Sequence, residues 1–291
     1  MLLAIVIFVA RLTLCYGFEI SRDGCEADLS INAERFRASV TYEIGDAYPS
    51  DAHYDANGNL FYVRITNDTH RRFFDVHIIE PNTGVDVNVA GLPKGISYSI
   101  AINNKTNEVY FGTVEGLFAY DYTTHSAFHL HEYKNAMIKH SFVLVDRADS
   151  FTILQNWNEM DQYLLTGERK ISFKGLGVIN EIAIDNESNV FFIKENKLFV
   201  LKNNNKVPVL LSNVTYNSVA QIVIHKDSVF LASGNLTYYH ENETRRLRLV
   251  NNAPGTATAM AFDGEGNFVL GVYGKFIRYE KVECYVRKNQ N

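Results

Sequence analysis

The sequence lacks the motifs of the familiar enzyme classes. Its 291 residues contain no Gly-x-Ser-x-Gly nucleophile motif, no glycine-rich phosphate-binding loop and no His-Glu-x-x-His zinc motif. Helical patterns are scarce as well, so the chain offers few places on which such a site could be built. A proline- or serine-rich linker is also missing, and 46% hydrophobic residues suffice for a core. We therefore expect one globular domain that is not an enzyme.

Long hydrophobic runs are confined to the N-terminus. Leu2 to Ala10 is an unbroken apolar run with the length of a signal-peptide core, too short for a bilayer-spanning helix of about twenty residues. Gly17 offers a small residue for cleavage, so we expect residues 1–17 to be a signal peptide and residues 18–291 to be a secreted domain. A buried N-terminal strand or a membrane anchor is the alternative. Removing Arg11 with the signal peptide leaves 27 Lys and Arg against 33 Asp and Glu, a net charge of −6, which does not favour nucleic acid or an anionic membrane.

Cysteine is also scarce, with three residues in the chain. Cys15 would leave with the signal peptide, which places Cys25 and Cys284 at the two ends of the mature chain. In the oxidising environment of secretion we predict that they form a disulfide, the alternative being two free thiols. Because Asn-x-Ser/Thr motifs are glycosylation acceptors in secreted proteins, we also predict that six such motifs carry glycans. Their asparagines are Asn67, Asn104, Asn186, Asn213, Asn235 and Asn242.

The chain does contain a repeated pattern of short strands. An apolar run, an Asp or Asn, a polar turn and a second apolar run recur six times, most clearly in IAIDNESNVFFIKENKLFVL from Ile182. We call the residue after the first apolar run the punctuating residue of each copy; it is a histidine in the fifth copy. The punctuating residues are Asp55, Asn103, Asp146, Asp185, His225 and Asp263, at intervals of 48, 43, 39, 40 and 38 residues. A period of about forty residues built from short strands is typical of radial β arrays with four strands per blade. The sequence therefore predicts an all-β, six-bladed β-propeller.

The last repeat lacks a fourth strand, and the N-terminal part of the chain offers one. Fourth strands are predicted at 85–91, 126–133, 169–174, 206–212 and 244–250, whereas the repeat after Ala259 ends at Cys284. The strand pattern of residues 35–44 belongs to no repeat. We predict that it completes the last blade and covers an edge that would otherwise template aggregation. The Cys25–Cys284 disulfide would then clamp the closure.

Aligning the repeats on the punctuating residues predicts a ring of side chains around the central channel. Four positions upstream the ring contains Asp51, Ser99, Phe142, Glu181, Gln221 and Ala259, of which four are polar. Polar groups in such a place need water, one another or a ligand. Together with aromatic residues expected on the same face, they suggest a pocket for a flat aromatic molecule. The predicted ligand-binding residues are Asp51, His53, Tyr98, Trp157, Asn180, Glu181, Gln221 and Tyr273.

Other interpretations of the channel stay open. Asp51 and Glu181 come from opposed blades and would suit a calcium ion, as in a calcium-dependent lactonase or gluconolactonase-like hydrolase. A water-filled structural channel and a protein-recognising glycoprotein are further alternatives. His129 and His131 share one face of a predicted outer strand and are compatible with a metal, but no third ligand is apparent and a solvent-facing strand is favoured. We predict neither a metal nor a cofactor.

Three segments of the chain resemble a known family. They are SYSIAINNKTNEVYFGTVEGLFAYDYTTHSA, INEIAIDNESNVFFIKENKLFVLKNN and AMAFDGEGNFVLGVYGKFIRYEKVEC, with EGLFAYDYTT and the closing Gly-Asn-Phe…Ile-Arg…Cys pattern the most specific. From Cys25 to Cys284 the chain resembles the ommochrome-binding proteins of lepidopteran haemolymph. The resemblance implies a secreted, non-enzymatic carrier of a tryptophan-derived phenoxazinone pigment such as xanthommatin, or of a related aromatic metabolite. We expect a monomer.

Overall fold

Six antiparallel sheets make up the part of the chain that the structure describes. The computed structural model describes residues 27–68, 71–94, 99–131, 143–146, 150–155, 159–164, 169–174, 176, 178–203, 205–216, 219–240 and 247–282, with the backbone alone for the third sheet. The first sheet consists of β3 (Tyr48–Tyr54), β4 (Leu60–Asp68), β5 (Arg71–Ile79) and β6 (Asp86–Asn88). The second consists of β7 (Ser99–Asn103), β8 (Glu108–Thr113), β9 (Gly116–Asp121) and β10 (Ser126–His129). The third consists of β11 (Val143–Asp146), β12 (Ser150–Gln155), β13 (Glu159–Leu164) and β14 (Arg169–Lys174).

The remaining sheets follow in chain order. The fourth consists of β15 (Ile179–Ile184), β16 (Val190–Lys194), β17 (Lys197–Leu201) and β18 (Val209–Leu210). The fifth consists of β19 (Gln221–His225), β20 (Ser228–Ser233), β21 (Asn235–His240) and β22 (Leu247–Leu249). The sixth has five strands in the order β1 (Leu29–Ile31), β2 (Glu34–Glu43), β25 (Lys275–Val282), β24 (Phe268–Val272) and β23 (Ala259–Phe262). No helix within the described ranges is long and apolar enough to cross a membrane.

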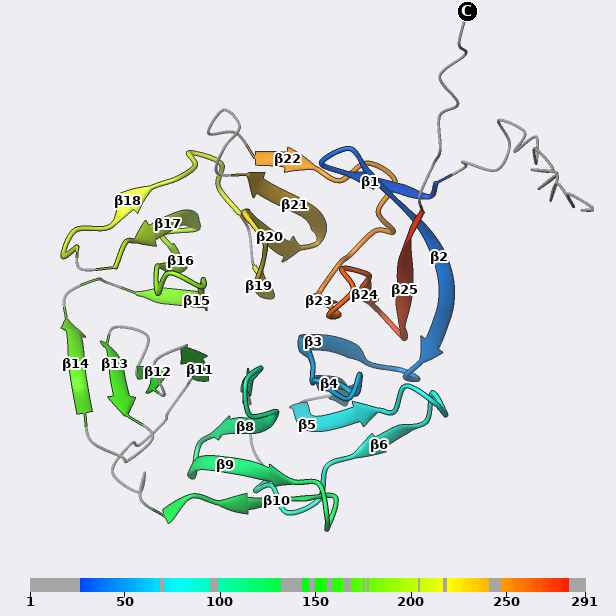
Figure 1. The fold of residues 1–291 in the computed structure, drawn as a ribbon, viewed down its shortest axis with the longest axis horizontal. Helices are drawn as coiled ribbons and strands as arrows, with labels where there is room; N and C mark the ends of the chain where they lie inside the picture. Colours follow the sequence, from blue (N-terminus) through cyan, green and yellow to red (C-terminus); the bar gives the residue numbers. More distant parts are fainter. Residues whose placement is uncertain are drawn as a thin grey trace, which may run out of the picture.

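The sheets are arranged in a ring around a central axis (Figure 1), and their innermost strands are β3, β7, β11, β15, β19 and β23. Each inner strand contacts the next, from β3 to β7, β11, β15, β19 and β23, and β23 contacts β3 again. This closed ring of radial antiparallel sheets is a β-propeller, so the predicted all-β propeller class is confirmed. The fourth strands occupy the expected segments: β14 has the predicted bounds, whereas the others are shorter and β18 keeps only two residues.

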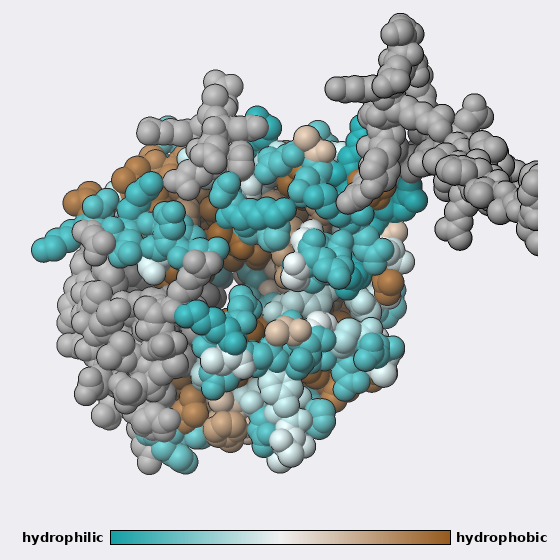
Figure 2. Space-filling model, in the orientation of Figure 1, coloured by the Kyte–Doolittle hydropathy of each residue, from teal (hydrophilic) through white to brown (hydrophobic). Residues whose placement is uncertain are grey.

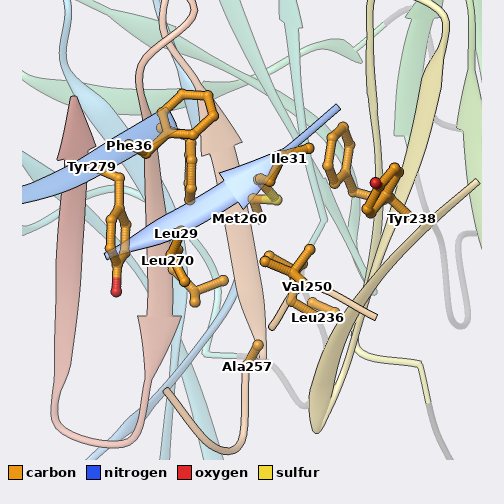
Figure 3. Packing of buried hydrophobic residues seen from close by; sticks show 13 residues of the cluster. Leu29, Ile31, Phe36, Leu236, Tyr238, Val250, Ala257, Met260, Leu270 and Tyr279 are labelled. Atoms are coloured by element: carbon orange, nitrogen blue, oxygen red, sulfur yellow. The ribbon is translucent and has the colours of Figure 1, made fainter. Parts of the chain in front are cut away.

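The N-terminal segment joins the sheet of the C-terminal strands. β2 pairs antiparallel with β25, from Arg35 opposite Val282 to Glu43 opposite Lys275. This is the position that the sequence predicted for residues 35–44. β1 adds a fifth strand that was not predicted, because three residues are too short to show a strand period. Figure 3 shows why β1 is held: Leu29 and Ile31 lie among Met260 and Leu270 of the sixth sheet and Leu236, Tyr238 and Val250 of the fifth.

The hydrophobic core is divided into layers between neighbouring sheets. One buried cluster joins the first and second sheets, another the fourth and fifth, and a third the sixth and first. Many of the aromatic residues are used here: Phe61, for example, packs edge-on against Tyr120 with ring centroids 5.1 Å apart. Such layers stabilise the ring because each sheet alone has two apolar faces to bury.

A hydrogen-bonded turn links the first two strands of several sheets, and it explains the repeated Asp. Asp185 Oδ1 accepts from the backbone N–H groups of Glu187 and Asn189, and its Oδ2 accepts from Asn189 Nδ2 at 2.7 Å. The same arrangement recurs at Asp55 with Asn59 and at Asp263 with Asn267. The sequence pattern therefore marks one end of the inner strands in these sheets.

Candidate functional site

Two inner strands carry a bulge at the predicted ring of polar residues. In β3 the register shifts between Ser50 and His53, and in β15 it shifts between Ile179 and Ile182. The extra residues include Asp51 and Glu181, which lie on the first and fourth sheets and therefore on opposite sides of the ring. Asp51 adopts a positive φ of 45°, a conformation that aspartate tolerates better than most residues. The bulges therefore turn two carboxyl groups towards the same region.

Asp51 is held by neighbours on two sheets. Its Oδ1 lies 2.8 Å from Nε2 of His53, and its Oδ2 accepts a 2.6 Å hydrogen bond from the backbone N–H of Ile100. Both carboxylate oxygens thus have a partner within the protein. Asp51 connects the first sheet to the second at this level of the channel.

Glu181 favours the neutral acid. The side chain keeps some exposure to the channel, yet protein atoms surround its carboxyl group. This burial raises the pKa of Glu181 well above its ordinary value of 4.5, and the negative charge of Asp51 raises it further. Because the charge of Asp51 acts on Glu181, the two residues lie close enough to interact electrostatically although they belong to opposed sheets.

Gln221 joins inner strands of three sheets through hydrogen bonds of its side-chain amide. Its side-chain Nε2 donates to the carbonyl oxygen of Ala52 at 3.0 Å, and its Oε1 accepts from the backbone N–H of Met260 at 2.9 Å. Only 2% of the residue is exposed. Both ends of the amide are therefore used to join the fifth sheet to the sixth and to the first.

A cavity of about 900 Å³ opens at the other end of the inner strands. Its wall contains the later residues of β3, β7, β15, β19 and β23, and its rim contains the turns that begin at Asp55 and Asp263. Figure 2 shows a hollow near the middle of the molecule, bordered on its described side by hydrophilic residues. Of the predicted site residues, His53 lines this cavity, whereas Asp51, Asn180, Glu181, Gln221 and Tyr273 do not.

Aromatic rings cover part of the cavity wall. The rings of His225 and Phe262 stack with centroids 3.9 Å apart and an interplanar angle of 10°. Burial lowers the pKa of His225, and the charge of Lys226 lowers it further, so the imidazole is neutral at physiological pH. Tyr54 also lines the cavity, and burial raises the pKa of its phenol.

Charged groups lie beside these rings. Arg278 donates from its guanidinium to Asp263 Oδ2 at 3.0 Å, and both residues line the cavity. Asp263 also accepts three hydrogen bonds in its own turn, which fixes its position. The described wall of the cavity therefore combines flat apolar faces with a cation, Arg278, and a few fixed acceptors.

The remaining predicted residues lie elsewhere. Tyr273 is 49% exposed in the turn between β24 and β25, with its ring 4.7 Å from that of Tyr48. That turn is at the opposite end of the inner strands from the cavity, because β24 runs antiparallel to β23. Asn180 is half-buried beside Glu181. Tyr98 and Trp157 lie outside the described residues, as do the predicted signal peptide, Cys25, Cys284 and Asn242.

Sequence reasoning missed Tyr54, Phe262 and Arg278 and did not use His225. His225 carried a visible signal, because it is the one imidazole among the six punctuating residues. The five predicted glycosylation asparagines within the described ranges are all exposed: Asn67, Asn104, Asn186, Asn213 and Asn235. Asn104 also lies on the wall of the cavity.

The described residues do not form a cluster suited to calcium. No group of three or more His, Cys, Asp or Glu side chains within those ranges is placed to hold a metal ion. Calcium takes six to eight oxygen ligands. Both oxygens of Asp51 already have partners within the protein, and Asp51 and Glu181 alone do not supply a full set of calcium ligands. Within the described residues the two predicted donors therefore do not make a calcium site by themselves.

Comparison with known proteins shows that the chain has a propeller fold and does not show its family or its function. No family model and no curated protein matches the sequence. A gluconolactonase from Xanthomonas campestris superposes with a TM-score of 0.68 over 86% of this chain and 91% of its own, at 10% identity. Virginiamycin B lyase from Staphylococcus aureus gives a TM-score of 0.55 over 85% of this chain and 100% of its own, at 11% identity. A chain of a nidogen/laminin complex gives 0.52 over 68% and 76%, at 8% identity. At such identities the similarity shows the fold alone.

Proposed function

We propose that this protein is a secreted carrier that binds a flat aromatic molecule in the channel cavity of a six-bladed propeller. The observation that carries the proposal is the stacked pair of His225 and Phe262 on the wall of a cavity of about 900 Å³. Ligand pockets of roughly 300–1,000 Å³ with ring-lined walls and a few fixed polar groups suit small molecules. Stacking on aromatic faces favours a planar ligand.

The ligand class comes from the resemblance to ommochrome-binding proteins. A phenoxazinone is a flat, fused ring system with polar substituents, and the cavity pairs ring faces with Arg278. The proposed location differs from the mouth favoured by the sequence, and it shares only His53 with the predicted residues. Secretion is supported by the N-terminal apolar run and by the exposure of five sequon asparagines.

The second candidate is a calcium-dependent lactonase-like hydrolase on the same scaffold. The similarity to a gluconolactonase and the carboxyl pair of Asp51 and Glu181 favour it. The partners that Asp51 already has, and the lack of a third acidic or imidazole ligand beside the pair within the described residues, count against a calcium ion between them. We therefore rank the carrier first.

One experiment separates the two. Purified protein is titrated calorimetrically with xanthommatin and with kynurenine-pathway metabolites, and lactone hydrolysis is followed in parallel with and without added calcium. A carrier gives saturable binding of one aromatic compound per protein and no hydrolysis above the uncatalysed rate. Calcium-dependent hydrolysis without binding of any aromatic compound would replace the carrier with the hydrolase.

A further inference from the structure

Two histidine rings meet at the outer edge of the second sheet, away from the channel. His129 is the last residue of β10, and His131 is two residues further along the chain. Their Nδ1 atoms lie 3.0 Å apart, with ring centroids separated by 4.7 Å. Neither residue belongs to the cavity, so a site built on this pair is independent of the proposed function.

The hydrogen bond on the far side of His129 fixes its tautomer. Nε2 of His129 lies 3.2 Å from the backbone carbonyl oxygen of Glu115. A carbonyl oxygen only accepts, so the neutral imidazole carries its proton on Nε2 and presents the lone pair of Nδ1 towards His131. The hydrogen between the two Nδ1 atoms must then come from His131. A backbone acceptor on one ring nitrogen is the usual device that orients a metal-binding histidine.

The packing around His129 holds the ring in this orientation. His129 is paired with Phe118 across the strands, and the two rings meet edge to face at 4.9 Å. Gly116 faces the Nε2 edge of the imidazole, since a Cβ atom there would be only 2.9 Å from Nε2. The missing side chain therefore leaves room for the ring to reach Glu115. His129 is therefore held by its neighbours, whereas His131 is exposed at the surface.

We propose that His129 and His131 form a two-nitrogen site for a divalent transition-metal ion, with Cu²⁺ as the preferred ion. Imidazole nitrogens bind first-row metals at about 2.0–2.1 Å, so two nitrogens 3.0 Å apart subtend about 95° at the metal. This angle is that of neighbouring ligands in the tetragonal geometry favoured by Cu²⁺, which also binds most tightly in the divalent series. The metal replaces the proton on Nδ1 of His131, which passes to solvent, and water fills the remaining positions.

The test uses the metal alone. Cu²⁺ is titrated into the purified protein, His131→Ala and His125→Asn, with affinity measured by calorimetry and nitrogen coordination by electron paramagnetic resonance. His125 is a matched control, because it is an exposed histidine of the same sheet with a φ of 52° that asparagine tolerates. Circular dichroism confirms that each variant is folded.

The proposal expects one Cu²⁺ with two coordinated imidazole nitrogens in the wild type and in His125→Asn. In His131→Ala the affinity should fall at least about tenfold and the two-nitrogen signature should be lost. Equal Cu²⁺ affinity in His131→Ala and the wild type, or the absence of a two-nitrogen spectrum in the wild type, would overturn it.

Discussion

The side-chain amide of Gln221 donates to the backbone carbonyl oxygen of Ala52 at 3.0 Å, which joins the fifth sheet to the first across the inner edge of the sixth. The same amide accepts from Met260 N at 2.9 Å, so three inner strands share one side chain. These two hydrogen bonds fix the relative positions of the inner strands of the three sheets. Gln221, one of the polar residues of the predicted ring, thus has a structural role that requires no ligand.

Replacement of Gln221 should weaken the closed ring. Gln221→Leu keeps the approximate volume but leaves a buried carbonyl oxygen and a buried N–H group without their partner. Each such group costs about 1–3 kcal/mol, so we expect the free energy of unfolding to fall by about 2–5 kcal/mol. Urea denaturation of Gln221→Leu and Gln221→Glu measures it. Gln221→Glu should also be destabilised, because its carboxylate would face the Ala52 oxygen. If both variants were as stable as the wild type, the hydrogen bonds of Gln221 would not contribute to stability.

Glu181 should make the protein less stable as the pH rises. Its pKa is raised in the folded state, so above pH 4.5 the folded protein holds a proton that the unfolded chain releases. Stability is therefore lost with increasing pH through that window. Glu181→Gln removes the effect and should be more stable than the wild type at neutral pH, with the difference vanishing towards pH 4.5. Denaturation of both proteins from acidic to neutral pH checks this, and a constant difference across the range would contradict it.

The hydrogen-bonded turn at Asp185 should contribute measurably to stability. Asp185→Ala removes the acceptors of two backbone N–H groups and of Asn189 Nδ2. Hydrogen bonds to charged groups contribute about 1.5–3 kcal/mol, and we expect a loss of that size for the set. Asp227→Ala, at an exposed residue of the next sheet, should change stability by less than about 0.5 kcal/mol. Similar losses in both variants would show that the hydrogen bonds of this turn contribute no more to stability than an exposed side chain does.

The predicted Cys25–Cys284 disulfide is consistent with the position of the described chain ends. Arg35 lies opposite Val282, and Asp28 donates from its backbone N–H to the carbonyl oxygen of Phe36, so both ends belong to the sixth sheet. Replacing both cysteines by serine should lower the free energy of unfolding by about 5 kcal/mol, because the cross-link spans nearly the whole chain. Non-reducing peptide mapping tests the bond directly. Two unmodified thiols in the secreted protein would refute it.

The repeat pattern predicted the fold because its polar turns have a structural cause. Asp55, Asp185 and Asp263 recur since each caps the same turn, which makes the period visible. The N-terminal strand was predictable because one repeat lacked a partner. β1 was not, because its burial depends on side chains of the fifth and sixth sheets that are distant in sequence.

The site was harder to predict. Aligning the repeats gives the height of a residue along the channel, but it does not say at which end the channel widens. The register shifts at Asp51 and Glu181 leave no mark on the sequence, and the engagement of Gln221 depends on strands far apart in the chain. His53, which was predicted, and His225, the one imidazole among the punctuating residues, were the sequence features that pointed to the cavity.

We propose that the ligand lies against His225 and Phe262 in the cavity. Calorimetric titration of xanthommatin into the wild type, His225→Ala and Tyr273→Ala tests this position, because the two side chains lie at opposite ends of the inner strands. Loss of a stacking ring costs up to about 1.5 kcal/mol, so His225→Ala should bind roughly tenfold more weakly while Tyr273→Ala matches the wild type. Weaker binding in Tyr273→Ala with unchanged binding in His225→Ala, or no binding by the wild type, would show that the ligand does not lie at His225.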